Sequence, residues 1–231
     1  LGLKLMPESL DISKRRNFDI KRANPIGAIA QVAKYKWVGL LILVFCFEEL
    51  ATLVYPTTWS FYTGHKFGWS MSEIGYSLTF LGVFMVIMEA GMVGIIVKRI
   101  GNVGIVYLGL SVSAFSLFLY GVVTETWMVY IVLMINSVGT IGMIGVRAIM
   151  SYNVPDDAQG ELQGAISSAS SIVAIFSPLV MTQIYGLTSD VEGGFYFPGA
   201  AYVFAAILAF TGLLVFRHID KKAKFKKLDQ G

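Results

Sequence analysis

Residues 103–123 read VGIVYLGLSVSAFSLFLYGVV, a stretch with no Asp, Glu, Lys, Arg or His side chain. A helix needs about 20 mostly apolar residues to cross the roughly 30 Å of hydrocarbon in a bilayer, and this stretch has that length. Runs of similar length and character lie before and after it. We place these further runs at residues 37–56, 74–97, 127–146, 164–187 and 196–216.

The composition of the whole chain agrees with this pattern. Of 231 residues, 55% are hydrophobic and 14% are charged, against about 25% charged in ordinary globular domains. The mean hydropathy is +0.67. Continuous apolar runs favour helices over a barrel, whose strands alternate in segments of about ten residues. The sequence therefore predicts an all-α membrane protein with six transmembrane helices in a bundle over residues 37–216.

The cations predict the orientation of the bundle. With the six runs as placed, 17 of the 18 Lys and Arg side chains fall on one side and only Lys66 falls on the other. By the positive-inside rule, both ends are cytoplasmic. Residues 1–36 then form a cytoplasmic linker ending in a short surface helix, and residues 217–231 form a basic cytoplasmic tail. The basic segments are also compatible with lipid or nucleic-acid binding, but topogenic charge explains them without a nucleic-acid partner.

Acidic side chains inside the apolar runs are the main functional candidates. Glu48 and Glu49 lie in the first run and Glu89 lies in the second. A carboxylate in hydrocarbon is costly, so such a group faces a cavity or a partner and marks an ion or substrate pathway by default. Desolvation also favours the protonated form of a carboxyl group, which suits proton exchange. The structural alternative is a carboxyl group held by a neighbouring helix.

The first of these runs carries a polar stripe. Glu48, Thr52 and Tyr55 recur at helical spacing and share one face, whereas Glu49 points about 100° away. We interpret the stripe as a wall that faces substrate or protons, with interhelical hydrogen bonding as the alternative. Pro56 is expected to loosen or end this helix.

The run 127–146 carries a second stripe. Asn136, Thr140 and Arg147 follow one another at helical spacing. Arg147 is either a gating residue or a cation that extends to the membrane interface. Glycines at three-residue spacing beside this stripe are expected to allow close approach of a neighbouring helix. They are Gly139, Gly142 and Gly145.

Runs 103–123 and 196–216 lack acidic and basic side chains and are expected to face lipid. The chain carries no phosphate-binding Gly-Lys-Ser/Thr loop, no His-Glu-x-x-His motif and no nucleophile elbow. Cys46 is the single cysteine, and His65 and His218 lie in loops on opposite sides of the membrane. We therefore expect neither an enzyme nor a metal or cofactor site.

Several loop motifs together resemble the tetracycline-resistance type of exporter in the major facilitator superfamily. They are PDDAQGELQGA at 155–165, LMPESL at 5–10, RANPIGA at 22–28, FGWS at 67–70 followed by Ile74-Gly75, and GIIVKRIG at 94–101. The last resembles the cytoplasmic loop motif of the superfamily, which implies that Gly94, Lys98, Arg99 and Gly101 help to lock one conformation through charge contacts.

This resemblance implies that residues 1–36 hold the end of helix six and the central cytoplasmic linker. The six runs then correspond to helices seven to twelve of a twelve-helix carrier, in a bacterial inner membrane. The chain then reads as a fragment whose partner is an N-terminal six-helix half. Exporters of this type carry an acid early in helix nine, but residues 108–114 contain none, so Glu89 or the first run is expected to couple transport to protons. The favoured function is proton-coupled export of an amphipathic small molecule. The alternatives are a nutrient symporter of the same fold and a non-transporting membrane scaffold or sensor.

Overall fold

The computed structural model describes residues 25–190, 196–223 and 225, and in this part of the chain the regular structure is helical. The predictions for residues 1–24 and for the end of the basic tail lie outside the described residues. In chain order the elements are α2 (Pro25–Ala33), α3 (Val38–Thr52), α4 (Val54–Phe67), α5 (Met71–Val86), the π-helical turn η3 (Ile87–Met92), α6 (Val93–Val122), α7 (Thr126–Gly139), α8 (Ile141–Tyr152), the 3-10 turn η4 (Asp156–Ala158), α9 (Gln159–Thr188) and α10 (Ala200–Ala223).

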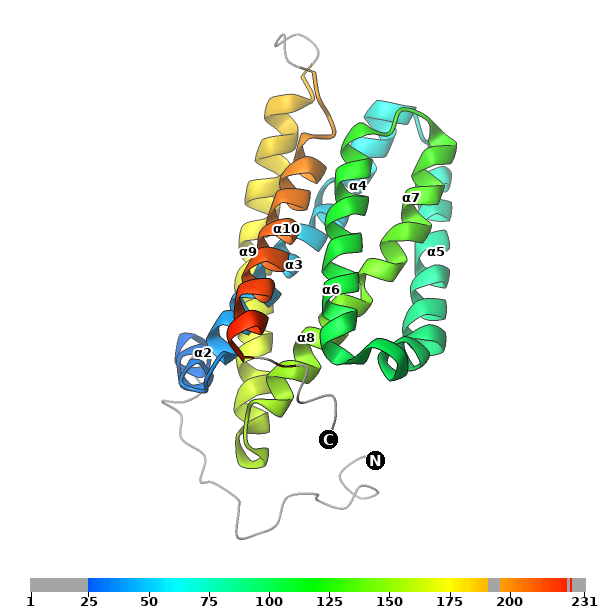
Figure 1. The fold of residues 1–231 in the computed structure, drawn as a ribbon. Helices are drawn as coiled ribbons and strands as arrows, with labels where there is room; N and C mark the ends of the chain where they lie inside the picture. The colour runs from blue at the N-terminus through cyan, green and yellow to red at the C-terminus, as the bar shows by residue number, and fades with distance from the viewer. Residues whose placement is uncertain (1–24, 191–195, 224, 226–231) are drawn as a thin grey trace, which may run out of the picture.

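Within the described residues, five continuous helical stretches are long and apolar enough to cross a membrane. The predicted runs 74–97 and 103–123 both fall in one stretch of 52 residues, Met71–Val122, in which two helices are joined at a kink. This stretch turns back at Gly101, whose φ of 72° and ψ of 175° are not helical. Such a backbone conformation favours glycine. As a result, α5 and most of α6 run in opposite directions, and α7 packs against both of them (Figure 1).

The first apolar run continues further than expected. Pro56 does not end the helix. The interruption lies at Leu53, between α3 and α4, and Pro56 belongs to the first turn of α4. A proline is tolerated there because the first amides of a helix have no partner within the helix. The helix then continues to Phe67, so His65, which was expected in a loop, lies in its last turn together with Lys66.

The junction between α4 and α5 follows from local sequence. Gly68 ends α4 in the left-handed conformation, with φ of 69°. Ser70 begins α5 with a capping box, in which its side chain accepts the amide of Glu73 and the Glu73 carboxylate accepts the amide of Ser70. These caps satisfy the backbone groups that helix ends leave open. The chain therefore reverses within a few residues and places α5 beside α7 (Figure 1).

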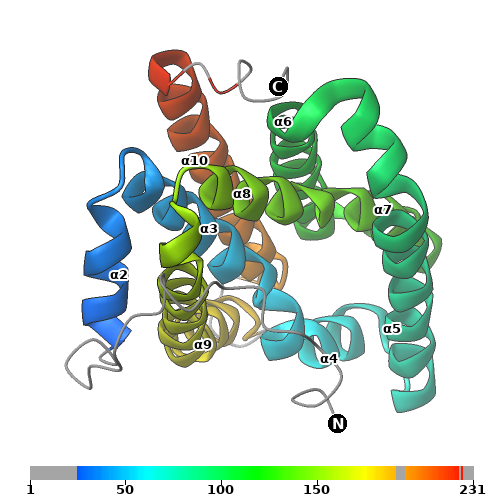
Figure 2. The same ribbon diagram turned by 90° about the horizontal axis from the view of Figure 1, so that it is seen from below.

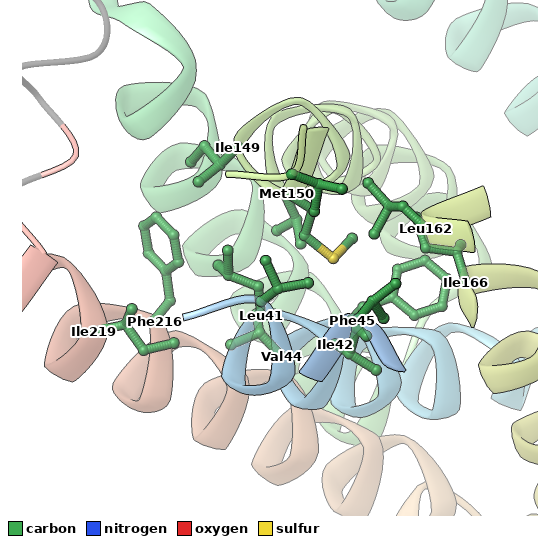
Figure 3. Packing of buried hydrophobic residues seen from close by; sticks show 14 of the residues in the cluster. Leu41, Ile42, Val44, Phe45, Ile149, Met150, Leu162, Ile166, Phe216 and Ile219 are labelled. Atoms are coloured by element: carbon green, nitrogen blue, oxygen red, sulfur yellow. The ribbon is translucent and has the colours of Figure 1, made fainter. Parts of the chain in front are cut away.

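One tightly packed core lies near the end of the bundle where α2 is found. Leu41 and Phe45 of α3 meet Met150 of α8, Leu162 of α9 and Phe216 of α10 (Figure 3). Viewed along the bundle, α2 lies at its edge beside α9 (Figure 2). Lipid tails are as apolar as these side chains, so close packing contributes more to this core than removal from water does. The core fixes the relative positions of α3, α8, α9 and α10.

The backbone of α6 closely approaches α8 and the end of α7 along a line of glycines, as predicted. A Cβ atom placed on Gly109 would lie 2.3 Å from the Cα of Gly142, and one on Gly139 would lie 3.1 Å from the Cα of Ser113. One on Gly145 would lie 2.7 Å from side-chain atoms of Val106. We call this contact the glycine seam. No larger residue fits at its centre without moving a helix.

The expectation that 103–123 and 196–216 simply face lipid is wrong. Both α6 and α10 bury one face in the bundle, with residues such as Leu110, Leu117 and Tyr202 fully buried. The other faces, which include Phe115 and Ile207, are exposed. A lack of charged side chains indicates that a helix crosses lipid, but it does not show which face packs against other helices.

Candidate functional site

A cavity of about 370 Å³ opens between α3, α5, η3, α6, α7 and α8. It gathers polar side chains that lie up to a hundred residues apart in the sequence. Its lining residues are Glu48, Glu49, Thr52, Met85, Glu89, Ser113, Asn136, Gly139, Thr140, Met143 and Arg147. Every predicted pathway residue except Tyr55, together with Arg147, thus borders one cavity.

The three carboxyl groups at this cavity have different surroundings. Glu48 is only 2% exposed, and the Ser113 hydroxyl donates a hydrogen bond to its Oε1. Glu49 is half-buried and accepts a hydrogen bond of 3.1 Å from Ser170 on α9. Glu89 is exposed. Glu48 and Glu49 of α3 therefore both border the cavity. Glu48 is held inside the bundle, whereas Glu49 is turned towards α9.

The helices that carry these groups are interrupted beside the cavity. Thr52 is the last residue of α3, Glu89 lies in the π-helical turn η3, and Thr140 separates α7 from α8. π-helical turns occur often at functional sites, and irregular backbone at membrane depth is tolerated where it lines a cavity. The sequence did not indicate these interruptions, because none of them contains a proline.

The wall opposite Glu48 is made by α7 and α8. Asn136 accepts a hydrogen bond of 2.9 Å from Ser116, which is fully buried on α6. Arg147 is exposed and its guanidinium carbon lies 5.3 Å from the centre of the Phe45 ring. This side chain therefore borders the cavity and contacts α3.

Tyr55 lies outside the cavity lining. Its ring packs among aromatic side chains of α4, α6 and α10, with ring centres 5.7 Å from Trp59, 5.6 Å from Tyr120 and 5.9 Å from Tyr202. The interruption at Leu53 lies between Thr52 and Tyr55. Helical spacing alone placed these two residues on one face, and the break in the helix separates them.

Two serines of α6 were missed in the sequence. Ser113 and Ser116 are buried, and they bind Glu48 and Asn136, the predicted residues of two different helices. In the sequence, the indication of their role was a pair of hydroxyl side chains at three-residue spacing in a run without charged side chains. Small polar side chains of this kind bond across helices in membranes.

The predicted loop motif surrounds the reversal between α5 and α6. Gly94, Lys98 and Arg99 lie in the first turns of α6 and are exposed, and the chain turns at Gly101. Two adjacent cations are therefore presented at the same end of the bundle as α2.

Comparison with known proteins agrees with this architecture. A sequence model of the Major Facilitator Superfamily matches residues 26–230. The chain belongs to the Major Facilitator Superfamily. This membership and the apolar helices identify an integral membrane protein of a transporter family.

Among curated proteins, the chain is 30% identical over 194 residues to the tetracycline resistance protein of class C from Escherichia coli, and the match covers 84% of the chain and 49% of that protein. It is 28% identical over 166 residues to the class D protein from Salmonella ordonez, covering 72% of the chain and 42% of that protein. The human hippocampus abundant transcript-like protein 1 is 22% identical over 241 residues, covering 96% of the chain and 48% of that protein. The chain thus spans about half the length of these relatives.

Proposed function

We propose that this chain is the C-terminal half of a proton-coupled exporter that expels an amphipathic small molecule. The observation that carries the proposal is the cavity in which Glu48, Glu49 and Glu89 face the polar side chains of α7 and α8. Carboxyl groups inside a membrane bundle mark ion and substrate pathways. Relatives named tetracycline resistance proteins support export of a drug-like molecule.

The two kinds of carboxyl environment support a division of roles. Glu48 is enclosed and bound by Ser113, so it can hold a proton away from water. Glu89 is exposed at the cavity and Met85 lies beside it in the lining. A carboxylate next to a flexible apolar side chain suits a molecule with one polar and one apolar part. Uptake or loss of the proton at Glu48 would then be coupled to binding at Glu89.

The wider architecture is also part of the proposal. Because the chain spans about half the length of its relatives, its partner would be an N-terminal half of the same protein, related by a repeat axis along the membrane normal. The reversal at Gly101 lets the stretch Met71–Val122 cross the membrane twice, which gives six crossings in this half. Both ends of the chain would face the cytoplasm of a bacterium, where the cations gather.

Arg147 and the loop motif would control the movement of the two halves. Arg147 borders the cavity near the end of the bundle that carries the exposed Lys98 and Arg99. Cations at this level can bind acidic groups of the partner half in one conformation and release them in another. Gly101 supplies the turn that holds Lys98 and Arg99 at the membrane surface.

The test is transport by the full-length protein in inverted membrane vesicles, with tetracycline and ethidium as separate probes. A pH gradient is imposed, and both probe movement and proton movement are recorded. We expect Glu48→Gln to abolish proton movement, because a glutamine cannot exchange a proton. Glu89→Gln should weaken probe binding more than it changes proton movement. Glu125→Gln is the matched control, since Glu125 is an exposed acid at the start of α7 and lies outside the cavity lining.

The outcomes separate the alternatives. Movement of a probe in the same direction as the protons would indicate a symporter. No movement of either probe or protons at any pH would favour a scaffold or sensor. Coupled export that survives in the Glu48→Gln and Glu89→Gln variants would refute the assignment of these two residues.

A further inference from the structure

A second cavity lies on the outside of the bundle, between α6 and α10. This groove has a volume of about 530 Å³ and shares no lining residue with the transport cavity. Its lining residues are Ser111, Ala114, Phe115, Phe118, Val203, Ala206, Ile207, Phe210 and Leu213, of which only Ser111 is polar.

The groove opens away from the bundle and towards lipid. Phe115 is 55% exposed and Ile207 is 58% exposed, whereas Ala206 at its floor is 7% exposed. Aromatic and branched side chains thus form two ridges with small residues between them. A flexible hydrocarbon chain fits such a groove.

Cations follow the groove at one end. One face of α10 continues from the groove to these cations, because four of its residues recur at spacings of four, three and four. They are Phe210, Leu214, Arg217 and Lys221. Arg217 and Lys221 are exposed. Ten residues separate Ile207 from Arg217, which corresponds to about 15 Å along a helix. This distance is half of the roughly 30 Å hydrocarbon thickness, so a chain that starts at Arg217 reaches the middle of the bilayer in the groove.

The acidic residue nearest to these cations in the sequence is occupied elsewhere. Asp220 accepts a hydrogen bond of 3.0 Å from the hydroxyl of Tyr107 on α6. Its position in the helix is about 100° from that of Lys221. Lys222, the next cation, also lies about 100° from Lys221, on the opposite side. Within the described residues of α10, Arg217 and Lys221 are therefore the two cations that continue the groove face.

We propose that the groove between α6 and α10 binds one acyl chain of an anionic glycerophospholipid, whose phosphate lies against Arg217 and Lys221. The apolar lining alone accepts any lipid tail, and the cations select a headgroup with net negative charge. This inference requires only that α10 crosses the membrane and does not depend on transport.

The experiment is native mass spectrometry of the full-length protein. Phosphatidylglycerol and phosphatidylcholine with the same acyl chains are added together, and the ratio of the two lipids that remain bound is measured. Each cation near the surface favours the anionic lipid about fivefold. We expect Arg217→Gln with Lys221→Gln to lower the occupancy ratio of the two lipids about 25-fold. Lys222→Gln is the matched control, because it removes the same charge from another face and should leave the ratio unchanged.

A second variant tests the groove itself. Ser111 is exposed at the groove lining, so Ser111→Phe fills the space from the lipid side without displacing a buried residue. We expect this variant to retain less of both lipids. The proposal is overturned if Lys222→Gln lowers the ratio as much as the double variant does, if Ser111→Phe retains its lipid, or if inorganic phosphate displaces phosphatidylglycerol. A dimer that dissociates in the Ser111→Phe variant would also overturn it, since the groove would then bind a second copy.

Discussion

The glycine seam between α6 and α8 and the wall formed by α5 and η3 border the same cavity, yet they are built in opposite ways. Along the seam, the backbones are so close that a Cβ atom on Gly109 would lie 2.3 Å from the Cα of Gly142. Along α5 and η3, added Cβ atoms at Gly82 and Gly91 would meet nothing within 4 Å. In the stretch Met71–Val122, which contains α5, only 6% of the most apolar segment is buried.

This difference divides the cavity into a fixed side and an open side. Glu48 and Ser113 belong to the fixed side, where each position is determined by packing within this chain. Glu89 belongs to the open side, where the polar groups still have unfilled space around them. Movement is easier to accommodate on the open side, since it breaks few contacts there.

The largest effect is expected from one methyl group in the seam. Gly109→Ala forces α6 and α8 apart, because the new Cβ would overlap the backbone of Gly142. Overpacking of this kind destabilises a protein by about 3 kcal/mol or more when backbone must move. Thermal unfolding of the purified protein measures this loss.

Gly82→Ala on α5 is the matched control. The same methyl group meets open space there, and alanine is preferred over glycine inside a helix by about 1 kcal/mol. We expect an unchanged or slightly raised unfolding temperature. Equal destabilisation by the two substitutions would show that the seam is no more tightly packed than α5.

The next effect concerns the hydrogen bond on the fixed side of the cavity. Ser113→Ala removes the donor to Oε1 of Glu48 and leaves the buried carboxyl group without this partner. Leaving a buried polar group unsatisfied costs about 1–3 kcal/mol. Ser111→Ala, an exposed serine of the same helix, should change the unfolding free energy by less than about 0.5 kcal/mol. A similar change in both variants would mean that the hydrogen bond to Glu48 contributes little.

Much of the fold was predictable because lipid imposes a simple requirement. A run such as 164–187 must be long, apolar and helical to cross the bilayer. The observed helix α9, Gln159–Thr188, includes this whole run. The spacing of Gly139 and Gly142 likewise predicted a close helix contact. The reversal at Gly101 lies between the predicted runs 74–97 and 103–123. The break at Leu53 was not predicted, because hydropathy does not show an interruption inside an apolar run.

The residues around the cavity were predicted from polarity, but their partners were not. A carboxyl group at Glu48 or Glu89 stands out in an apolar run whatever it contacts. Ser113 does not stand out, because a serine is common at helix interfaces. Tyr55 was grouped with Glu48 by helical spacing, and that grouping required a continuous helix through Leu53.

The smallest effect is expected at Tyr55, which the structure assigns to the aromatic packing and not to the cavity. Tyr55→Phe keeps the ring that packs against Trp59, Tyr120 and Tyr202. We expect the unfolding free energy to change by less than about 0.5 kcal/mol and transport of both probes to remain at the level of the unmodified protein. Tyr55→Ala removes a partly buried ring and should destabilise the protein more than Tyr55→Phe does, by no more than the about 3–5 kcal/mol that a fully buried aromatic side chain contributes. If Tyr55→Phe instead impaired transport while stability was kept, the hydroxyl group would belong to the pathway, and the cavity would extend past Leu53 into α4.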